Sequence, residues 1–344
     1  VIWLRTLKYI KTNSYRRILS WLDFEWQLLK YSKKSLPKPD VIICSSLSIL
    51  TILNGLILKL KYKCKLVFEV RDIWPLTLVE EGGYKTLNPL VILLGLIEKI
   101  GYKYSDFIVG TMPNLKEHVD GVLGYSKQVD CVPMGYDRYH LDTDKIEELP
   151  ADYIKQHIPK DKFIVAHVGS MGITNSLETL LECAVSMAKF ESIHFLIVGD
   201  GDLRDYYIGK YGNLSNVSFG SKVPKAMVQS ILYESDVVYF SAPKSRVWQY
   251  GQSLNKVVDY MLSGKPIVAS YDGYRSMINE ANSGVFIEAE NPIILKDTLL
   301  SFSNKTSEEL KEIGSRGREW LLKNRSYKDL AIAYANLLFP KNHD

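Results

Sequence analysis

The segment KFIVAHVGSMGITNSLETLLECA, residues 162–184, decides the fold class of this chain. Its first part is a short apolar run rich in β-branched residues, which predicts a buried strand. A loop with two glycines follows, and the apolar spacing then changes to that of a helix. Strands that alternate with helices form parallel sheets that helices cover on both faces. The segment therefore predicts an α/β fold.

The same alternation recurs along the chain in two sets of strands. The first set is expected at residues 40–46, 65–72, 106–110 and 129–135, with a helix over 88–104. The second set is expected at residues 162–170, 195–201, 216–220, 236–243, 265–270 and 284–289. Two sets predict two Rossmann-like, doubly wound domains that face a cleft, with ligands at the carboxyl ends of the strands.

The chain has 344 residues, a length that fits two domains. We expect an N-terminal domain over residues 1–140, a linker over 141–162 and a second domain over 163–325. The remaining residues, 326–344, are expected to form a helix that can pack back on the first domain. No solenoid repeat or low-complexity tract is visible.

Residues 1–34 combine eight lysines and arginines with only two acidic residues and several aromatic ones. The stretch includes Trp3, Arg5, Lys8, Tyr9, Lys11, Tyr15, Arg16, Arg17, Trp21, Phe24, Trp26, Lys30, Tyr31, Lys33 and Lys34. This mixture suits an anionic membrane surface or a phosphate-bearing partner. The alternative is a solvated basic helix whose aromatic side chains face the core.

The composition excludes several other classes of protein. The four cysteines, at positions 44, 64, 131 and 183, form no CxxC pair, and we expect buried, reduced thiols. The histidines have no metal-site spacing, so we expect no metal. The apolar residues 41–60 are interrupted by polar ones and predict a strand and a helix rather than a membrane span. We expect no signal peptide and no nucleic-acid partner.

Two strand–glycine–helix junctions in the second domain could approach a phosphate. Gly169, Ser170 and Gly172 lie in the first loop, and Ser176 is expected to cap the helix that follows. An ordinary turn between strand and helix is the alternative. Gly199 begins the second loop, in which Asp200 or Asp202 is expected to cap the next helix. Arg204 stands at the third glycine position of a dinucleotide motif, which disfavours a dehydrogenase.

The stretch YGQSLNKVVDYMLSGKPIVAS, residues 250–270, predicts a polar loop, a helix and a buried strand. Ser253 or Asn255 would offer a polar group at the helix start. Lys256 lies in the first turn, where a cation opposes the helix dipole unless an anionic ligand is bound. Asp259 follows three residues later on roughly the same face and suits ribose hydroxyls. The alternative is a solvent-facing Lys–Asp pair.

In the first domain, the stretch EVRDIWP carries Arg71, Asp72 and Trp74 at the end of a predicted strand. Large functional side chains there fit the wall of a binding cleft. The alternative is a structural ion pair of Arg71 with Asp72 or Glu69.

The stretches that carry a family resemblance are FEVRDIWP, IVGDGDLR, FGSKVPK, SLNKVVDYMLSGKPIVAS and NSGVFIEAENP. In these stretches the chain resembles retaining glycosyltransferase family 4, which has the glycosyltransferase-B (GT-B) fold. It looks closest to the bacterial fucosyl- and N-acetylfucosaminyl-transferases of O-antigen and capsule synthesis. The resemblance implies transfer of a hexosyl or N-acetylhexosaminyl group from a nucleotide-diphosphate sugar, UDP by default, with retention and without a metal. It implies a polyprenyl-diphosphate-linked saccharide as acceptor and a cytoplasmic enzyme at the inner face of the plasma membrane.

The resemblance also assigns roles to residues. It implies that Lys256, Arg71 and Asp72 are catalytic and that Arg71, Asp72 and Trp74 lie on the acceptor side. The implied donor site comprises Gly169, Ser170, Gly172, Gly199, Lys222, Val223, Arg246, Ser253, Leu254, Asn255, Lys256 and Asp259. The region of Lys222 and Val223 would hold the base through backbone groups.

This chain departs from the family pattern at four places. Gly251 stands where the family has the first glutamate of a pair, and Asp259 takes the second position. The stretch SMGITNS lacks the usual arginine and lysine. Arg71 replaces a histidine, and the first strand and its glycine-rich loop are absent, so we expect an incomplete N-terminal domain.

Three alternatives stay open at this point. A nucleotide-sugar 2-epimerase shares the architecture but should carry paired carboxylates and histidines. A non-catalytic or incomplete nucleotide-binding protein fits the departures above. A dehydrogenase is the most distant, since its glycine motif is incomplete.

Overall fold

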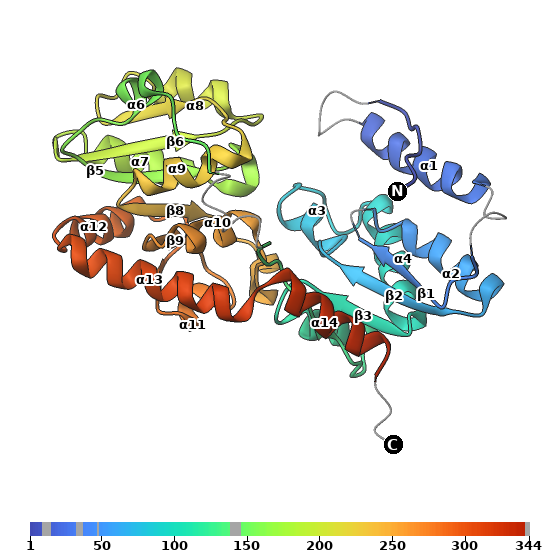
Figure 1. Cartoon of the computed structure of the whole chain (residues 1–344). Helices are drawn as coiled ribbons and strands as arrows, with labels where there is room; N and C mark the ends of the chain where they lie inside the picture. Colours follow the sequence, from blue (N-terminus) through green and yellow to red (C-terminus); the bar gives the residue numbers. More distant parts are fainter. Residues whose placement is uncertain (9–14, 32–36, 47, 138–145, 341–344) are drawn as a thin grey trace. The chain divides into compact units, whose positions relative to one another are not determined.

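The computed structural model describes residues 1–8, 15–31, 37–46, 48–137 and 146–340. It confirms the α/β class, because two separate sheets are present and every strand pairing in both is parallel. The chain divides into two compact units (Figure 1). The first comprises Val1–Pro133 with Tyr334–Asp344, and the second comprises Met134–Ala333.

The first unit is built on a four-stranded sheet in the order β1-β2-β3-β4. Its strands are β1 (Val41–Ser45), β2 (Lys65–Val70), β3 (Phe107–Gly110) and β4 (Asp130–Cys131). Its helices are α1 (Tyr15–Lys30), α2 (Thr51–Tyr62), α3 (Leu76–Glu80), α4 (Pro89–Tyr104) and α5 (Leu115–Leu123). All four expected strands are therefore present.

Helices α2 and α4 cover the same face of this sheet. A Cβ on Gly55 of α2 would meet Cys44 and Leu66, and one on Gly101 of α4 would meet Phe68. These three sheet residues share one face, since Cys44 is paired with Phe68. The opposite face carries Val67, which packs with Leu338 near the C-terminus.

The second unit contains a six-stranded sheet. Its strands are β5 (Phe163–Val168), β6 (Ile193–Val198), β7 (Val217–Gly220), β8 (Val237–Ser241), β9 (Ile267–Ser270) and β10 (Gly284–Ile287). Its α-helices are α6 (Ala151–His157), α7 (Glu178–Ser186), α8 (Arg204–Tyr211), α9 (Val228–Tyr233), α10 (Asn255–Ser263), α11 (Met277–Glu280), α12 (Pro292–Ser303) and α13 (Ser307–Asn324). Short 3₁₀ turns are η3 (Ile173–Asn175), η4 (Lys225–Met227) and η5 (Arg246–Tyr250). Helix α14 (Tyr327–Leu338) begins in this unit and ends in the first.

The order of the six strands positions the site. The sheet runs β7-β6-β5-β8-β9-β10, which is the 3-2-1-4-5-6 order of a doubly wound dinucleotide-binding sheet. Successive strands are added on one side of β5 up to β7 and on its other side from β8 onward, so the strand order reverses between β5 and β8. Such sheets bind ligands at this switch point, at the carboxyl ends of the strands. Separate apolar cores lie on the two faces, as a doubly wound sheet requires.

Local details differ from the sequence expectations at several loops. Ser176 follows η3 in the left-handed conformation with φ 42°, so it does not cap α7, which begins at Glu178. Neither Asp200 nor Asp202 caps α8, because the residue before that helix is Leu203. The Asp200 side chain instead accepts a hydrogen bond from the neighbouring Gly201 amide.

Two further details concern the cysteines and the expected linker. All four cysteines are free, but only Cys44 and Cys183 are buried, since Cys64 is half-buried and Cys131 is exposed. The expectation of four buried thiols is therefore wrong. The segment 141–162 contains helix α6, and its residues 141–145 lie outside the described residues.

Candidate functional site at the carboxyl end of β5

The carboxyl end of β5 is fixed by a buried tyrosine from α10. The hydroxyl of Tyr260 accepts a hydrogen bond from the Val168 amide at 2.9 Å and donates one to the Val168 carbonyl at 3.1 Å. Burial raises the pKa of Tyr260 above its usual range, so the hydroxyl keeps its proton. These two bonds tie α10 to the strand end and hold Gly169 at the switch point.

Two glycines let the loops after β5 and β6 pack backbone against backbone. A Cβ on Gly199 would lie 1.8 Å from the Gly169 carbonyl oxygen, and one on Gly201 would lie 2.6 Å from that of Met171. The amide of Gly169 donates to Val198 at 2.9 Å. Gly199 and Gly201 also have φ of 148° and 155°, which favour glycine. Both glycines are therefore required by the close approach of the two loops.

Lys256 lies in the first turn of α10 and reaches across to the β5 loop. Its ammonium donates a hydrogen bond to the side-chain oxygen of Asn175, which ends η3. Leu254 precedes the helix and offers no side-chain oxygen to its first-turn amides. Burial lowers the pKa of Lys256 to about 8. A half-buried cation, held by a neutral amide at a helix N-terminus, is an arrangement that an anion would stabilise.

His167, near the end of β5, lies next to Gly169 and Lys256. Its Nδ1 lies 3.2 Å from the Tyr239 carbonyl oxygen, whereas its buried Nε2 has no hydrogen-bond partner among the described residues. A Cβ on Gly169 would lie 3.5 Å from that Nε2 and 3.8 Å from Cε of Lys256. Burial, and then the charge of Lys256, lower the pKa of His167 to about 3. The imidazole is therefore neutral at pH 7.

The carboxyl end of β8 anchors the same loop from the other side of the switch point. The hydroxyl of Ser241 donates a hydrogen bond of 2.5 Å to the Asn175 carbonyl. Asn175 is itself 8% exposed, so its side-chain amide is held in place next to Lys256. The structure thus brings Gly169, Asn175 and Lys256 together with His167.

The alternative reading of these two residues, a solvent-facing Lys256–Asp259 pair, is wrong. The Asp259 carboxylate instead pairs with Lys225 of η4, with both oxygens 2.5 Å from the ammonium nitrogen. Gln229 of α9 also donates to the Asp259 carbonyl at 3.1 Å. Lys256 and Asp259 therefore project from one helix but contact different loops. Lys256 bonds to the neutral amide of Asn175, and Asp259 pairs with the oppositely charged Lys225.

Other expected donor residues have structural contacts or lie at the surface. The Ser253 hydroxyl accepts a hydrogen bond of 2.7 Å from the Met134 amide, which fixes the loop before α10. Val223 is partly buried and packs against the apolar core that contains Ile231 and Leu232 of α9. Ser170, Lys222, Arg246 and Asn255 are exposed, and Gly172 is half-buried.

In the first unit, Arg71, Asp72 and Trp74 follow the end of β2, as expected. The Ser46 hydroxyl accepts from the amides of Arg71 at 2.9 Å and Asp72 at 3.2 Å, and donates to the Asp72 carbonyl at 3.2 Å. Trp74 stacks edge-on against Trp21 of α1, with ring centroids 5.5 Å apart. A single buried serine from the end of β1 therefore shapes this turn.

Three residues with unusual environments were missed by the sequence reasoning. Burial, followed by the charges of Asp72 and Glu80, raises the pKa of Glu81 to about 7. One Glu81 oxygen is buried and makes no hydrogen bond to any described residue. The other two residues that the sequence did not indicate as part of the site are Asn175 and His167. Strand alternation could have indicated His167 as a strand-end residue, but no sequence signal marked Asn175 or Glu81.

Neither a metal site nor a membrane-spanning helix is found among the residues that the structure describes. None of their His, Cys, Asp and Glu side chains gather in groups of three or more that could hold a metal ion. None of their helices combines the length and the hydropathy needed to cross a bilayer.

Comparisons with known proteins match the fold described above. Residues 162–305 match the family model described as glycosyl transferases group 1. No curated protein sequence matches the chain.

Solved structures match over both units. Sucrose-phosphate synthase from Thermosynechococcus elongatus is 17% identical, with a TM-score of 0.70 over 96% of this chain and 80% of that one. Anabaena HepE, in complex with UDP and glucose, is 15% identical, with a TM-score of 0.64 over 88% and 78%. WaaG, a glycosyltransferase involved in lipopolysaccharide biosynthesis, is 16% identical, with a TM-score of 0.60 over 80% and 78%. This chain therefore has the GT-B fold, and residues 162–305 form a glycosyltransferase group 1 domain.

Proposed function

We propose that the protein is a retaining glycosyltransferase that takes its sugar from a nucleotide-diphosphate donor. The observation that carries this proposal is the position of Lys256 at the switch point of the second sheet, where its side chain lies beside Gly169 and its ammonium bonds to Asn175. A doubly wound sheet binds nucleotides there, and a cation at a helix N-terminus suits a diphosphate. The group 1 match over residues 162–305 supports the same reaction class.

In the proposed reaction, Lys256 and the first amides of α10 bind the diphosphate and stabilise the charge that grows on it. The bond from the anomeric carbon to the diphosphate oxygen breaks, and the acceptor oxygen bonds to the same face of that carbon. The acceptor proton passes to the departing phosphate oxygen. Preorganised positive charge at the leaving group lowers the barrier most where negative charge develops. No metal is needed in this scheme, because Lys256 supplies the cation.

The remaining donor contacts follow from the same placement. Asp259 would accept hydrogen bonds from the ribose hydroxyls once its Lys225 pair opens. Backbone groups at Lys222 and Val223, after β7, would hold the base, for which uracil is the proposed identity. Arg246 would assist Lys256 at the diphosphate. HepE, whose structure is similar to this one, is solved in complex with UDP and with UDP-glucose.

For the acceptor we propose a polyprenyl-diphosphate-linked saccharide of cell-surface polysaccharide synthesis, such as O-antigen or capsule. Arg71, Asp72 and Trp74 of the first unit would face it, and Arg71 would bind its phosphate. The branch of family 4 that transfers fucosyl or N-acetylfucosaminyl groups remains the proposed relative. WaaG, which shares the fold, is a glycosyltransferase involved in lipopolysaccharide biosynthesis.

A lipid-linked acceptor requires contact with the inner face of the plasma membrane, which we propose for residues 1–34. On the described part of this stretch, Leu19, Leu22, Trp26 and Leu29 are exposed on α1, and the Lys30 ammonium lies 4.6 Å from the Trp26 ring centre. Tyr9, Lys11, Lys33 and Lys34, which belong to the predicted basic stretch, lie outside the described residues.

Calorimetric titration with UDP, GDP and NADH in the presence of EDTA tests the donor proposal. We expect UDP to bind and NADH not to bind. Binding of GDP alone would keep the reaction and change the base. Binding of NADH alone, or of no nucleotide, would refute the donor site. Release of UDP from a panel of UDP-sugars then separates an active transferase from a protein that only binds the nucleotide.

A further inference from the structure

The outer faces of two neighbouring helices in the first unit, α2 and α4, are apolar. We name these side chains the apolar platform. Their exposed fractions are 37% for Leu53, 50% for Ile57 and 78% for Leu60 on α2, and 49% for Ile92, 52% for Leu93, 56% for Leu96 and 37% for Ile100 on α4. Contiguous exposed apolar surface on a soluble domain usually marks an interaction site.

The spacing shows that the platform is one continuous stripe on each helix. On α2, Leu53, Ile57 and Leu60 follow the i, i+4, i+7 pattern of a single helix face. The faces toward the sheet are also apolar and carry Gly55 and Gly101. Both helices are therefore apolar on two sides, although the sheet buries only one of them.

Lysines continue each stripe toward the C-terminal end of its helix. Lys61 lies four residues after Ile57, and Lys103 lies seven residues after Leu96, so both stay on the stripe. The two ammonium groups each lie 5.3 Å from the ring centre of the following tyrosine. The single acidic residue of the two helices, Glu98, is 3% exposed. The outer surface is thus apolar and cationic, without an exposed carboxylate on either helix.

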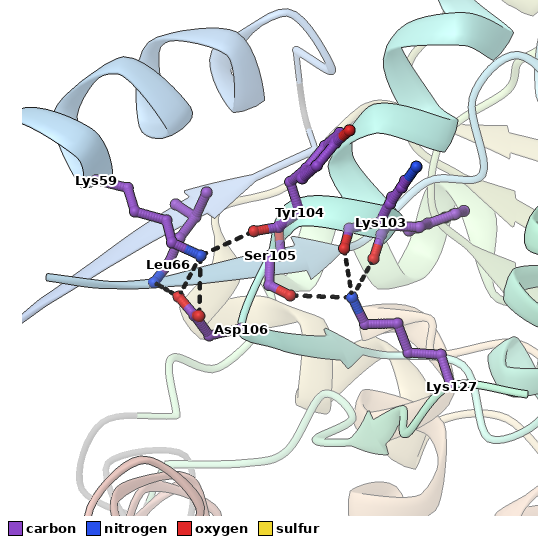
Figure 2. Close-up of polar contacts among 8 residues, drawn as sticks. Lys59, Leu66, Lys103, Tyr104, Ser105, Asp106 and Lys127 are labelled. Carbon is purple, nitrogen blue, oxygen red and sulfur yellow. Dashed lines mark hydrogen bonds and ion pairs between the residues drawn. The ribbon is translucent and has the colours of Figure 1, made fainter. Parts of the chain in front are cut away.

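The two helices are locked together at the end where the lysines lie (Figure 2). Lys59 of α2 donates 2.9 Å hydrogen bonds to the Tyr104 carbonyl at the end of α4 and to Asp106. Lys127 caps the same end of α4 through the carbonyls of Lys103 at 3.1 Å and Ser105 at 3.0 Å. The platform therefore has a fixed shape before it meets a partner.

From these observations we infer that the apolar platform docks on an anionic lipid bilayer surface. Apolar side chains enter the headgroup region, and lysines at one end bind lipid phosphates, as interfacial helices do. Lysine side chains bury their methylene stems and keep the ammonium at the polar surface. The inference rests on the proposed lipid-linked acceptor for its biological role and assigns the docking surface to α2 and α4 in addition to α1.

Co-sedimentation of the full chain with vesicles tests this inference. One set of vesicles contains phosphatidylglycerol and phosphatidylcholine, and the other contains phosphatidylcholine alone. The apolar variant is Ile57→Ser with Leu96→Ser, and the charge variant is Lys61→Glu with Lys103→Glu. Matched controls are Ile293→Ser, at a side chain 72% exposed on α12, and Lys311→Glu, at an exposed lysine on α13. Circular dichroism confirms folding, and UDP titration reports the donor site separately.

We expect the wild type to bind the anionic vesicles, and to bind them less at higher salt. Both platform variants should lose at least about tenfold in affinity, while the controls and the UDP affinities stay unchanged. A wild type that ignores anionic vesicles, or platform variants that bind them equally well, would overturn the inference. Sedimentation velocity covers self-association: a wild-type dimer that the apolar variant dissociates, with unchanged vesicle binding, would make the platform a contact between copies. UDP binding that persists in any of these cases leaves the donor proposal standing.

Discussion

Lys256 joins two properties that rarely occur together at a helix N-terminus. It is a cation in the first turn of α10, and its pKa is lowered to about 8 by burial. A neighbouring neutral group, the Asn175 amide oxygen, holds the ammonium in place without neutralising it. The residue is therefore ready to accept a negative ligand without breaking an ion pair first.

The lowered pKa predicts how donor binding depends on pH. The ammonium form binds the diphosphate, so affinity is full below the pKa of the free protein and falls as the pH rises through about 8. Above that value the dissociation constant for UDP should rise by up to roughly tenfold per pH unit, until the pKa in the complex is reached. Calorimetric titrations from pH 6.5 to 9.5 measure this dependence. A flat profile would mean that Lys256 does not contact the diphosphate.

Gly199 gives a second prediction at the scale of single residues. In Gly199→Ala the new Cβ would lie 1.8 Å from the Gly169 carbonyl, and φ is 148°. We expect a loss of at least about 2 kcal/mol in unfolding free energy, because neither loop backbone can move aside cheaply.

The matched control for this variant is Gly209→Ala on α8, where an added Cβ meets nothing within 4 Å. Alanine should raise stability there by about 0.5–1 kcal/mol through helix propensity. Urea denaturation of both variants compares them, and equal stabilities would contradict the packing of the two loops.

Among the elements, helix α1 is attached by one buried carboxylate. Glu25 is 8% exposed and accepts hydrogen bonds from Ser48 at 3.2 Å, Thr51 at 2.6 Å and Asn54 at 2.5 Å. These groups lie at the start of α2, where a negative charge is favoured by the helix dipole. Glu25 thus fixes the orientation of α1 against α2.

Replacing this carboxylate should loosen α1 selectively. Glu25→Ala leaves two buried donors, Ser48 and Asn54, and the half-buried Thr51 without their acceptor, which should cost about 1–3 kcal/mol in the local opening free energy of α1. Hydrogen exchange followed by mass spectrometry should show faster exchange over residues 19–30. Glu312→Ala, at a carboxylate 74% exposed on α13, is the control and should leave all exchange rates unchanged. Unaltered protection of α1 in Glu25→Ala would show that other contacts hold the helix.

The strands and long helices could be predicted from sequence because their signals are local. Strand β5 (Phe163–Val168) lies within the expected 162–170, and α4 begins at Pro89 after an Asn88 cap whose side chain accepts from Leu90. The parallel order also followed from alternation of strands and helices. Ser176 failed as a cap because it closes the 3₁₀ turn η3 in the left-handed conformation, which leaves Leu177 as the residue before α7.

Contacts between distant loops could not be predicted in the same way. Asn175 and Lys256 belong to different loops that meet only when β5 and α10 are assembled. The sequence pointed to Lys256 because of its position at a helix start, and the one partner it suggested for Asp259, in the alternative reading, was Lys256. Lys225, the residue that actually holds Asp259, precedes it by a whole helix and strand. Side-chain partners across loops depend on tertiary geometry rather than on local patterns.

For the whole molecule, the strand order of the second unit determines where chemistry can occur. The reversal between β5 and β8 brings Gly169, Ser241 and the start of α10 to one end of the sheet. The central claim is that a nucleotide diphosphate binds at this end against Lys256. The fold is shared with proteins that differ widely in sequence, so the claim depends on these residues rather than on the fold.

The most direct test is calorimetric titration of UDP, at pH 7 without metal, into the wild type, Lys256→Gln and the control Lys244→Gln. Lys244 is an exposed lysine paired with Glu288 on the same unit. We predict that UDP binds the wild type and the control alike and binds Lys256→Gln roughly 10- to 100-fold more weakly, the value of one charge-assisted hydrogen bond. Equal affinity in all three proteins, or no binding by the wild type, would contradict the placement of the diphosphate at the carboxyl end of β5.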